Sequence, residues 1–295
     1  MFRYLRLKQE PKIISPLPGS LSGEQLASDF TYPIQLLQLN NLPENTRRRI
    51  YRGLIPPELL VRFKIDPLTW LGVDSAELVT LQALPETSLV RVSVRPTAEA
   101  QDDFFHLEIS DNQYGSIELN FIILSDPDSP RFETDRDEQG NQTWFGTARR
   151  NLSEELRAAQ AGLAPGQTRG GLGSSRLVFQ QLEVFLSVLG HRSYFLEPLT
   201  YVSAWLFERL GFAYVRGHKL MDDIQREFQP GGVLNQSLDA SSPFRQPEQW
   251  QTVRGRAWAI QDGILETINA RWDKLRMIKH IGRHAGVMTF PDAIY

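Results

Sequence analysis

The sequence predicts an α/β protein of the α+β type, in which a mixed, mostly antiparallel sheet is flanked by helices. Three strand-like segments follow one another within residues 88–124. Residues 172–217 then alternate helix, strand, helix and strand. The chain has 295 residues, of which 41% are hydrophobic and 23% charged, so it is long enough to bury a sizeable core. We expect one main domain over residues 31–217, an N-terminal arm over 1–30 and a helical C-terminal extension over 218–295.

The N-terminal third combines an irregular arm with short elements. Residues 1–30 are rich in Pro, Gly and Ser and predict an extended arm that lacks the apolar segment of a secretory signal. The apolar run at 33–39 predicts a first strand. Two short helices are expected over 43–54 and 56–63, the second beginning at the Pro56-Pro57 pair.

The middle of the chain predicts a meander of strands. Residues 88–96 alternate apolar and polar side chains, as a half-buried strand does. Residues 104–110 and 116–124 are two more strands, with a turn between them. Residues 131–148 predict a hairpin with Gly140 and Asn141 at its tip.

From residue 151 the pattern becomes mainly helical. Asn151 can cap a helix that ends at Gly162, and Thr200 can cap another that ends at Gly211. Between them, apolar residues at helical spacing predict a helix from near Leu172 to position 189. Short strands are expected at 193–198 and 212–217. In the extension, apolar residues at helical spacing predict a long amphipathic helix over 253–282, followed by a last strand at 285–291.

Charge, cysteine content and hydropathy exclude several functional classes. The formal net charge of −3 gives no support for nucleic-acid binding. Cysteine is absent, which removes disulfides and cysteine-based zinc sites, and no apolar run reaches the roughly 18 residues of a membrane span. The five histidines show no metal-ligand spacing. We therefore expect a cytoplasmic protein without a metal.

Charge is unevenly distributed, and two interpretations of this remain open. Residues 101–118 contain five acidic residues and no Lys or Arg, whereas residues 245–284 contain eight Lys or Arg and four Asp or Glu. These are either solvated faces or, for the basic amphipathic segment, a surface for a protein partner. The same choice applies to three tail tryptophans, which either pack in a core or form part of such a surface: Trp250, Trp258 and Trp272.

The segment "LAPGQTRGGLGSSRL" at 163–177 places four glycines directly before an apolar helical run. Such a loop either is a flexible linker or directs bare backbone N–H groups at a phosphate near a helix N-terminus. Neither GxxxxGK[ST] nor GxGxxG fits it.

The order of elements around this loop resembles the GNAT superfamily of acyl-CoA-dependent N-acetyltransferases. The loop is similar to the family's pyrophosphate loop, R/Q-x-x-G-x-G/A, with Gly171 and Gly173 on its two glycines. The segment "WLFERLGFAYV" at 205–215 is similar to the family signature LYERLGFxxV. The resemblance covers residues 163–217. It departs from the family at Thr168, which stands at the R/Q position between Gln167 and Arg169, and at Phe207, which stands where a tyrosine is frequent.

The resemblance implies an acetyl-CoA or other acyl-CoA co-substrate held at the glycine loop. The implied CoA-binding residues are Arg169, Gly170, Gly171, Leu172, Gly173 and Ser174. The arm of CoA would lie where two parallel strands separate, and a carboxylate would take the proton of the attacking amine. Glu118, on the strand at 116–124, and Glu197, at the end of the strand at 193–198, are the candidates for this base. Each has a structural alternative: Glu118 as a surface carboxylate, Glu197 as a helix cap.

Two functions follow as hypotheses. In the first, the protein transfers an acyl group from acyl-CoA to an amine whose identity the sequence does not reveal. In the second, it is a catalytically weak or inactive GNAT-fold scaffold that docks onto a larger complex through its C-terminal extension. Residues of the tail such as Phe244 or Trp250 would then fill the acceptor groove.

Overall fold

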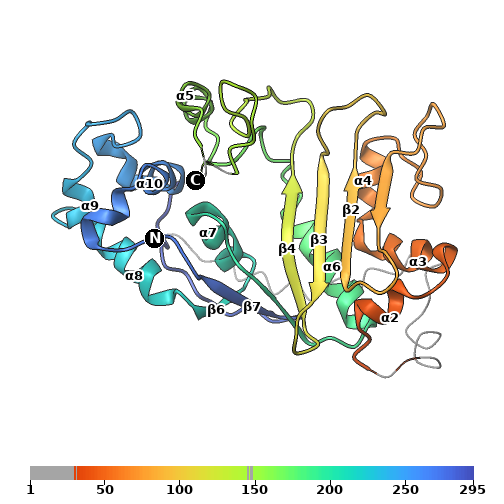
Figure 1. Cartoon of the computed structure of the whole chain (residues 1–295). Helices are drawn as coiled ribbons and strands as arrows, with labels where there is room; N and C mark the ends of the chain where they lie inside the picture. Colours follow the sequence, from red (N-terminus) through yellow and green to blue (C-terminus); the bar gives the residue numbers. More distant parts are fainter. Residues whose placement is uncertain (1–29, 31, 145, 147–148) are drawn as a thin grey trace, which may run out of the picture.

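The computed structural model describes residues 30, 32–144, 146 and 149–295. Almost the whole predicted arm therefore lies outside the described residues. The described chain forms one open, seven-stranded sheet in the order β1-β2-β3-β4-β5-β7-β6, flanked by helices (Figure 1). The predicted α+β class with a mostly antiparallel sheet is confirmed. The strands are β1 (Val79–Gln82), β2 (Leu89–Val94), β3 (Phe105–Asp111), β4 (Ile117–Leu124), β5 (Ser193–Leu196), β6 (Ala213–Arg216) and β7 (Arg276–His280).

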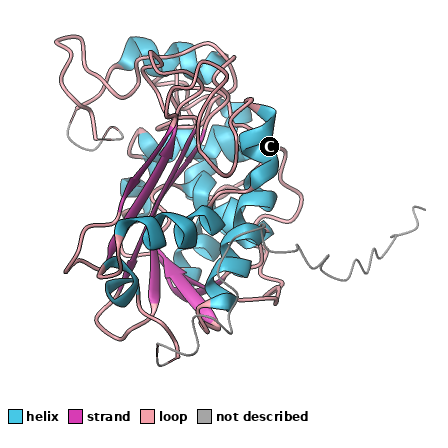
Figure 2. Ribbon diagram, turned by 90° about the vertical axis from the view of Figure 1, so that its right-hand side faces the viewer, coloured by secondary structure: helices cyan, strands magenta, loops and turns pink. Residues whose placement is uncertain are grey.

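The helices pack along this sheet, as Figure 2 shows in the view turned by 90°. The α-helices are α2 (Leu36–Asn40), α3 (Glu44–Tyr51), α4 (Pro57–Arg62), α5 (Leu152–Gln160), α6 (Ser175–Val188), α7 (Tyr201–Arg209), α8 (His218–Glu227), α9 (Val233–Gln236) and α10 (Val253–Gln261). Three 3₁₀ segments complete the set: η1 (Arg52–Leu54), η2 (Pro247–Gln251) and η3 (Ile264–Ile268).

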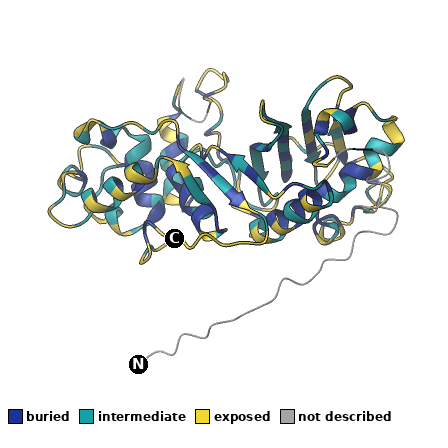
Figure 3. Cartoon of the chain, turned by 90° about the horizontal axis from the view of Figure 1, so that it is seen from below, coloured by how far each residue is buried: buried dark blue, intermediate teal, exposed yellow. Residues whose placement is uncertain are grey.

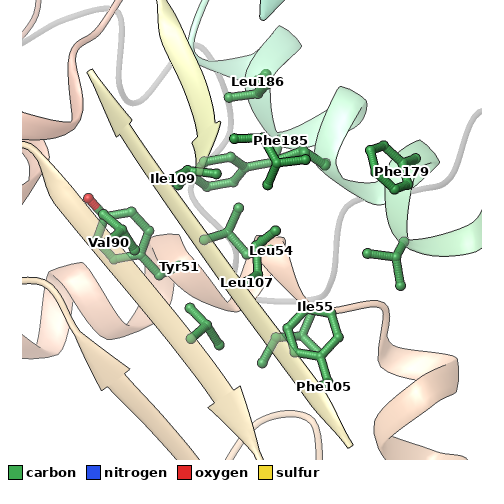
Figure 4. Packing of buried hydrophobic residues seen from close by; sticks show 14 of the residues in the cluster. Tyr51, Leu54, Ile55, Val90, Phe105, Leu107, Ile109, Phe179, Phe185 and Leu186 are labelled. Carbon is green, nitrogen blue, oxygen red and sulfur yellow. The ribbon is translucent and has the colours of Figure 1, made fainter. Parts of the chain in front are cut away.

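The alternating segments become the antiparallel strands β2, β3 and β4, as predicted. One face of β2 and β3 is buried, with Leu107 and Ile109 of β3 among its residues. Phe185 of α6 and Leu54 of η1 pack against this face (Figure 4). Figure 3 shows the same separation, with the dark-blue buried surfaces on the inner sides of the elements. Burial of this apolar surface is the main force that holds α6, and hence the loop before it, against the sheet.

A parallel strand pair interrupts the antiparallel sheet. β4 pairs with β5 only from Ile117 to Leu119. Directly afterwards β4 carries a bulge. Leu119 pairs with Ile109 and Phe121 pairs with Glu108, so that Asn120, between them, has no pairing partner on β3. A bulge bends its strand and ends regular pairing. In Figure 1, β4 and β7 are close at the lower edge of the sheet and diverge upward, with α7 between them.

The predicted first strand at 33–39 is wrong, since this segment forms the short helix α2. The carboxylate of Asp111 accepts hydrogen bonds from the N–H groups of Leu36 (2.9 Å) and Leu37 (2.9 Å). The helix start is therefore satisfied by a residue 75 positions away in sequence. The capping residue is too distant in sequence for a local pattern to reveal it. A short apolar run, moreover, does not distinguish a strand from a helix.

The predicted hairpin at 131–148 is also wrong for the part of it that the structure describes. One isolated bridge joins Arg136 to Gln142, but no strand forms there. The Asp137 carboxylate instead accepts hydrogen bonds from the backbone N–H groups of Gln139 (3.0 Å) and Asn141 (2.7 Å). This side chain stabilises a turn in place of a strand ladder.

The predicted long helix at 253–282 divides into α10, η3 and β7, and the predicted strand at 285–291 is absent. Gly263, Asn269 and Lys274 have φ angles of 84°, 51° and 53°, which a continuous right-handed helix cannot contain. β7 lies between β5 and β6 and pairs antiparallel with both. Part of the segment expected to form the C-terminal extension thus supplies an inner strand of the sheet.

Tyr194 of β5 carries a hydroxyl that is buried without a hydrogen-bond partner among the described residues. Burial, together with the nearby Glu183, raises its pKa well above the usual value. We expect Tyr194→Phe to stabilise the protein by about 1 kcal/mol, because a buried unsatisfied polar group is removed. Chemical denaturation measures this. The matched variant Tyr214→Phe, which loses a 2.8 Å bond to Glu208, should destabilise; equal effects of the two variants would contradict the assignment.

Candidate functional site

Two adjoining cavities lie where β4 separates from β5. The smaller, of about 140 Å³, is named here the β4–β5 cavity. The larger, of about 260 Å³, is named the loop cavity because Gly171 and Gly173 line it. Both are bounded by Ile122, Pro165, Gln167, Thr200, Ser203 and Phe207. The two cavities therefore form one continuous region that runs from the glycine loop to the end of β5.

The glycine loop lies against the end of β4. Leu172 N–H donates to the carbonyl of Leu124 (3.1 Å), and Gly170 N–H donates to the Ser129 hydroxyl (2.9 Å). Two of the six predicted CoA-binding positions thus use their N–H groups within the protein. The N–H groups of Gly171 and Gly173 donate to no other described residue. Gly171 forms an isolated antiparallel bridge with Ser125, and the hydrogen bonds of this bridge are made by its neighbours Gly170 and Leu172, so the N–H of Gly171 faces away from the end of β4.

Helix α6 begins at Ser175, three residues later than the predicted start near Leu172. Gly173 has a φ of 72°, in the left-handed region that favours glycine, and a Cβ atom there would meet nothing within 4 Å. The Ser174 side chain makes no capping hydrogen bond to the helix. The first N–H groups of α6 consequently lack an intrahelical acceptor and lie beside the loop cavity.

Arg169 lies on the far side of the loop from the cavities. Its guanidinium donates to Asp102 (3.0 Å) and to the carbonyls of Pro127 and Ser129. It lines neither the loop cavity nor the β4–β5 cavity. The resemblance implied a contact with CoA at this residue, whereas its observed contacts hold the loop in place.

Asp102 forms ion pairs with two arginines, Arg169 of the glycine loop and Arg131 outside it. Partial burial opposes its ionisation, but hydrogen bonds from both guanidinium groups hold its pKa below the usual value. A depressed carboxylate pKa adds stability above the unfolded pKa, near about 4, and this stability is lost as the pH falls through the folded pKa.

We expect Asp102→Asn to lower the free energy of unfolding by about 1–3 kcal/mol at pH 7, because charged hydrogen bonds are lost. The difference from the wild type should begin to shrink below about pH 4 and disappear once the pH has fallen through the lowered pKa of the folded state, where Asp102 is protonated in the wild type as well. Urea denaturation across this pH range measures it. A difference that stays constant down to pH 2 would count against the ion pairs as its source.

The two candidate bases have different surroundings. Glu118 does not line the cavities and accepts hydrogen bonds from Arg276 (2.7 Å) and Asn112 (3.3 Å). Glu197 is exposed, lines the β4–β5 cavity and has no hydrogen bond or ion pair with the other described residues. Nor does it cap α7, since the N–H of Ser203 bonds to the Thr200 hydroxyl (3.2 Å). Glu197 is therefore the better placed base of the two.

One face of α7 forms a wall of both cavities. The Thr200 hydroxyl donates to the Ser203 hydroxyl (3.2 Å), which in turn donates to the Thr200 carbonyl (2.8 Å), so both hydroxyl donors are used within α7 and its cap. Phe207, at the position of the family's tyrosine, is 9% exposed and packs edge-to-face on Phe179 at 5.8 Å and tilted on Phe212 at 5.2 Å. Its ring therefore belongs to the core as well as to the cavity wall.

Three residues that the sequence did not place in the site lie at or beside the glycine loop, and of these only Tyr295 lines a cavity. Arg176, in the first turn of α6, is exposed and has no acidic partner among the described residues. Arg62 of α4 approaches the carbonyl of Leu172 at 3.5 Å. Tyr295 lines the loop cavity from the end of the chain. For Arg176, its place just after the glycines is a usable sequence signal; the other two depend on contacts distant in sequence.

The tail tryptophans pack within the protein. Trp258 is buried and donates to the Leu163 carbonyl (2.8 Å), and Trp272 donates to Pro198 (3.2 Å). The residues expected to fill the groove in a scaffold, Phe244 and Trp250, do not line the two cavities. A larger cavity of about 480 Å³ lies between α3 and β1. It has no glycine loop, so we regard it as a separate feature.

Comparison of the chain with family models, with curated proteins and with solved structures finds no match. Within the described ranges, no helix is both long and apolar enough to cross a membrane. The same residues contain no group of three or more His, Cys, Asp or Glu side chains that could hold a metal ion.

Proposed function

We propose that the protein is an acyl-CoA-dependent N-acyltransferase. The observation that carries the proposal is the short parallel pairing of β4 and β5, which ends at Leu119 and opens into the two cavities. A glycine loop with outward N–H groups stands at one end of this region, and the carboxylate of Glu197 stands at the other. A long ligand with an anionic end and a reactive end matches both.

The chemistry assigns a role to each end. The N–H groups of Gly171 and Gly173 and the start of α6 bind the pyrophosphate, with the helix dipole and Arg176 adding favourable charge. The amine nitrogen attacks the thioester carbonyl, the C–S bond breaks, and CoA leaves as thiolate. Glu197 takes the proton that the amine loses. β4 beyond Leu119 has no β5 partner, which leaves its backbone free to polarise the thioester oxygen.

The direct test is release of CoA thiol from acetyl-CoA in the presence of a set of primary amines, together with calorimetric titration of CoA. We expect saturable binding and amine-dependent thiol release. Absence of binding by folded protein would refute the proposal. The lack of cysteine is compatible with a reducing compartment, and we propose the cytoplasm as the site of the reaction.

The scaffold hypothesis is retained because Phe207 has no proton to give. In that case the chain binds CoA without turnover and docks onto a protein partner through part of residues 245–284. Several basic side chains of that segment form ion pairs within the protein, as Arg245 does with Asp262 (2.9 Å) and Arg276 does with Glu118 (2.7 Å). The surface that remains for a partner is thus smaller than the sequence suggested.

Phe207→Tyr separates the two functions. If the protein is a transferase, a hydroxyl that reaches the cavity can protonate the leaving thiolate, and we expect thiol release to rise at least about tenfold. If Phe207 is only a core residue, the buried hydroxyl costs about 1–3 kcal/mol of stability and adds no rate. Turnover and thermal unfolding are measured on both forms. If neither the wild type nor the variant turns over acetyl-CoA although both bind CoA, the transferase hypothesis is excluded and the scaffold hypothesis stands.

A further inference from the structure

Two side chains in the loop cavity offer hydrogen-bond donors that the protein does not use. The Gln167 side-chain oxygen accepts from the N–H of Ala164 (2.8 Å), which fixes its amide nitrogen as the outward group. That nitrogen donates to no described residue. The Tyr295 hydroxyl likewise has no partner in the described part of the chain. Both side chains line the loop cavity, and Gln167 also lines the β4–β5 cavity.

Contacts with two side chains and a neighbouring backbone hydrogen bond hold Tyr295 in place. Its ring stacks on Trp205 at 5.4 Å with an angle of 5°, and the guanidinium of Arg254 lies 4.1 Å from the ring centre on a cation–π contact. The N–H of Val253 donates to the carbonyl of Ile294 (2.9 Å). In Figure 1 the end of the chain accordingly lies beside α10.

The segment that leads to Tyr295 follows α7. We name residues 285–295 the C-terminal strap. The Thr289 backbone N–H and hydroxyl donate to the buried carboxylate of Glu208 (2.9 and 2.7 Å), and the Trp205 indole donates to the Phe290 carbonyl (3.3 Å). The strap is thus attached to the helix that forms the cavity wall, and it presents Tyr295 at a fixed place.

We infer that Gln167 and Tyr295 are specificity-determining donors for the arm of the ligand, so that the C-terminal strap is part of the binding site. This inference rests on the proposed function. The rest of the cavity wall is largely apolar, with Ile122, Leu206 and Phe207 among its residues. An apolar wall with two isolated donors fits a long, uncharged chain that carries carbonyl acceptors. The amide-containing arm of CoA has this chemistry, and the adenosine end alone does not.

The test compares CoA with adenosine 3′,5′-bisphosphate, which lacks the arm, by calorimetric titration. Tyr295→Phe keeps the stacked ring and removes only the hydroxyl. Gln167→Glu keeps the acceptor for Ala164, removes the donor and adds a negative charge, whose effect on both ligands the comparison with the bisphosphate reveals. We expect each variant to raise the Kd for CoA about two- to tenfold, the effect of one hydrogen bond, and to leave the Kd for the bisphosphate unchanged. Tyr114→Phe and Gln113→Glu, both in the exposed β3–β4 turn, are the matched controls.

The outcomes separate the inference from the proposed function. If the wild type binds CoA and both variants bind CoA as tightly as the wild type does, the inference is wrong and the transferase proposal stands. If a variant weakens the binding of CoA and of the bisphosphate equally, its effect is structural or comes from added charge, and the inference is again wrong. If the wild type binds neither ligand, the proposed function itself fails.

Discussion

Replacing Glu197 with glutamine is expected to lower kcat for acyl transfer about 10²- to 10⁴-fold and to leave CoA binding unchanged. Glutamine has nearly the same shape as glutamate but cannot take the proton of the attacking amine. Glu197 lines the β4–β5 cavity, and its side chain makes no hydrogen bond or ion pair with the residues that the structure describes. The loss should therefore appear in the rate of thiol release, with the thermal unfolding temperature unaltered.

Glu118→Gln is the matched control for this prediction. Glu118 is bound to Arg276 at 2.7 Å, across β4 and β7, and lines neither cavity. Its replacement should lower stability by breaking the ion pair and have a much smaller effect on kcat. If Glu118→Gln instead abolished turnover while Glu197→Gln remained active, the assignment of the base would be reversed.

Gly173→Val is expected to weaken CoA binding about 10- to 100-fold, which corresponds to the loss of about 1–3 kcal/mol of backbone–phosphate hydrogen bonding. A side chain at this residue would project into open space at the wall of the loop cavity. It would also be strained, because the φ of 72° suits glycine and a β-branched residue rarely adopts it. Calorimetric titration of the folded variant with CoA measures the loss.

Strain alone must be separated from loss of the phosphate contact, and Gly282 provides the control. It has a φ of 71°, a Cβ there would also meet nothing within 4 Å, and it lines neither cavity. Gly282→Val should cost similar stability and leave CoA binding intact. Equal binding losses in the two variants would show that the glycine loop does not contact the ligand.

The parts of the fold that the sequence predicted are those specified by local pattern. β2 and β3 alternate buried and less buried residues, as β4 does over its first residues, and α5 and α7 begin at the predicted caps, Asn151 and Thr200. In each case the information lies within a few residues. The glycine loop before α6 was visible for the same reason, although its helix starts at Ser175 and not near Leu172.

The elements that the sequence did not predict depend on distant partners. β7 was hidden within an apparent amphipathic helix because its strand period includes a buried lysine, Lys279, which donates to the carbonyls of Leu210 (2.8 Å) and Arg283 (2.7 Å). A search for alternating hydrophobic residues counts this lysine as polar and therefore misses the strand. The edge strand β1, at Val79–Gln82, has only four residues and was missed altogether.

The structure brings only some of the predicted site residues together. Gly173 and Glu197 line the adjoining cavities, whereas Arg169 and Glu118 do not. The internal contacts of Arg169 could not be foreseen from the sequence because its partner, Asp102, is 67 residues away. Glu118 could not be judged until its partner on β7 was known. Tyr295 reaches the cavity only through the contacts of the C-terminal strap, which no local signal encodes.

A crystal structure of the protein grown with CoA would show where the ligand binds. We expect CoA in the two adjoining cavities, with its pyrophosphate against the N–H groups of Gly171 and Gly173 and its arm between β4 and β5. CoA bound elsewhere, with the loop cavity empty, would refute the proposed binding site.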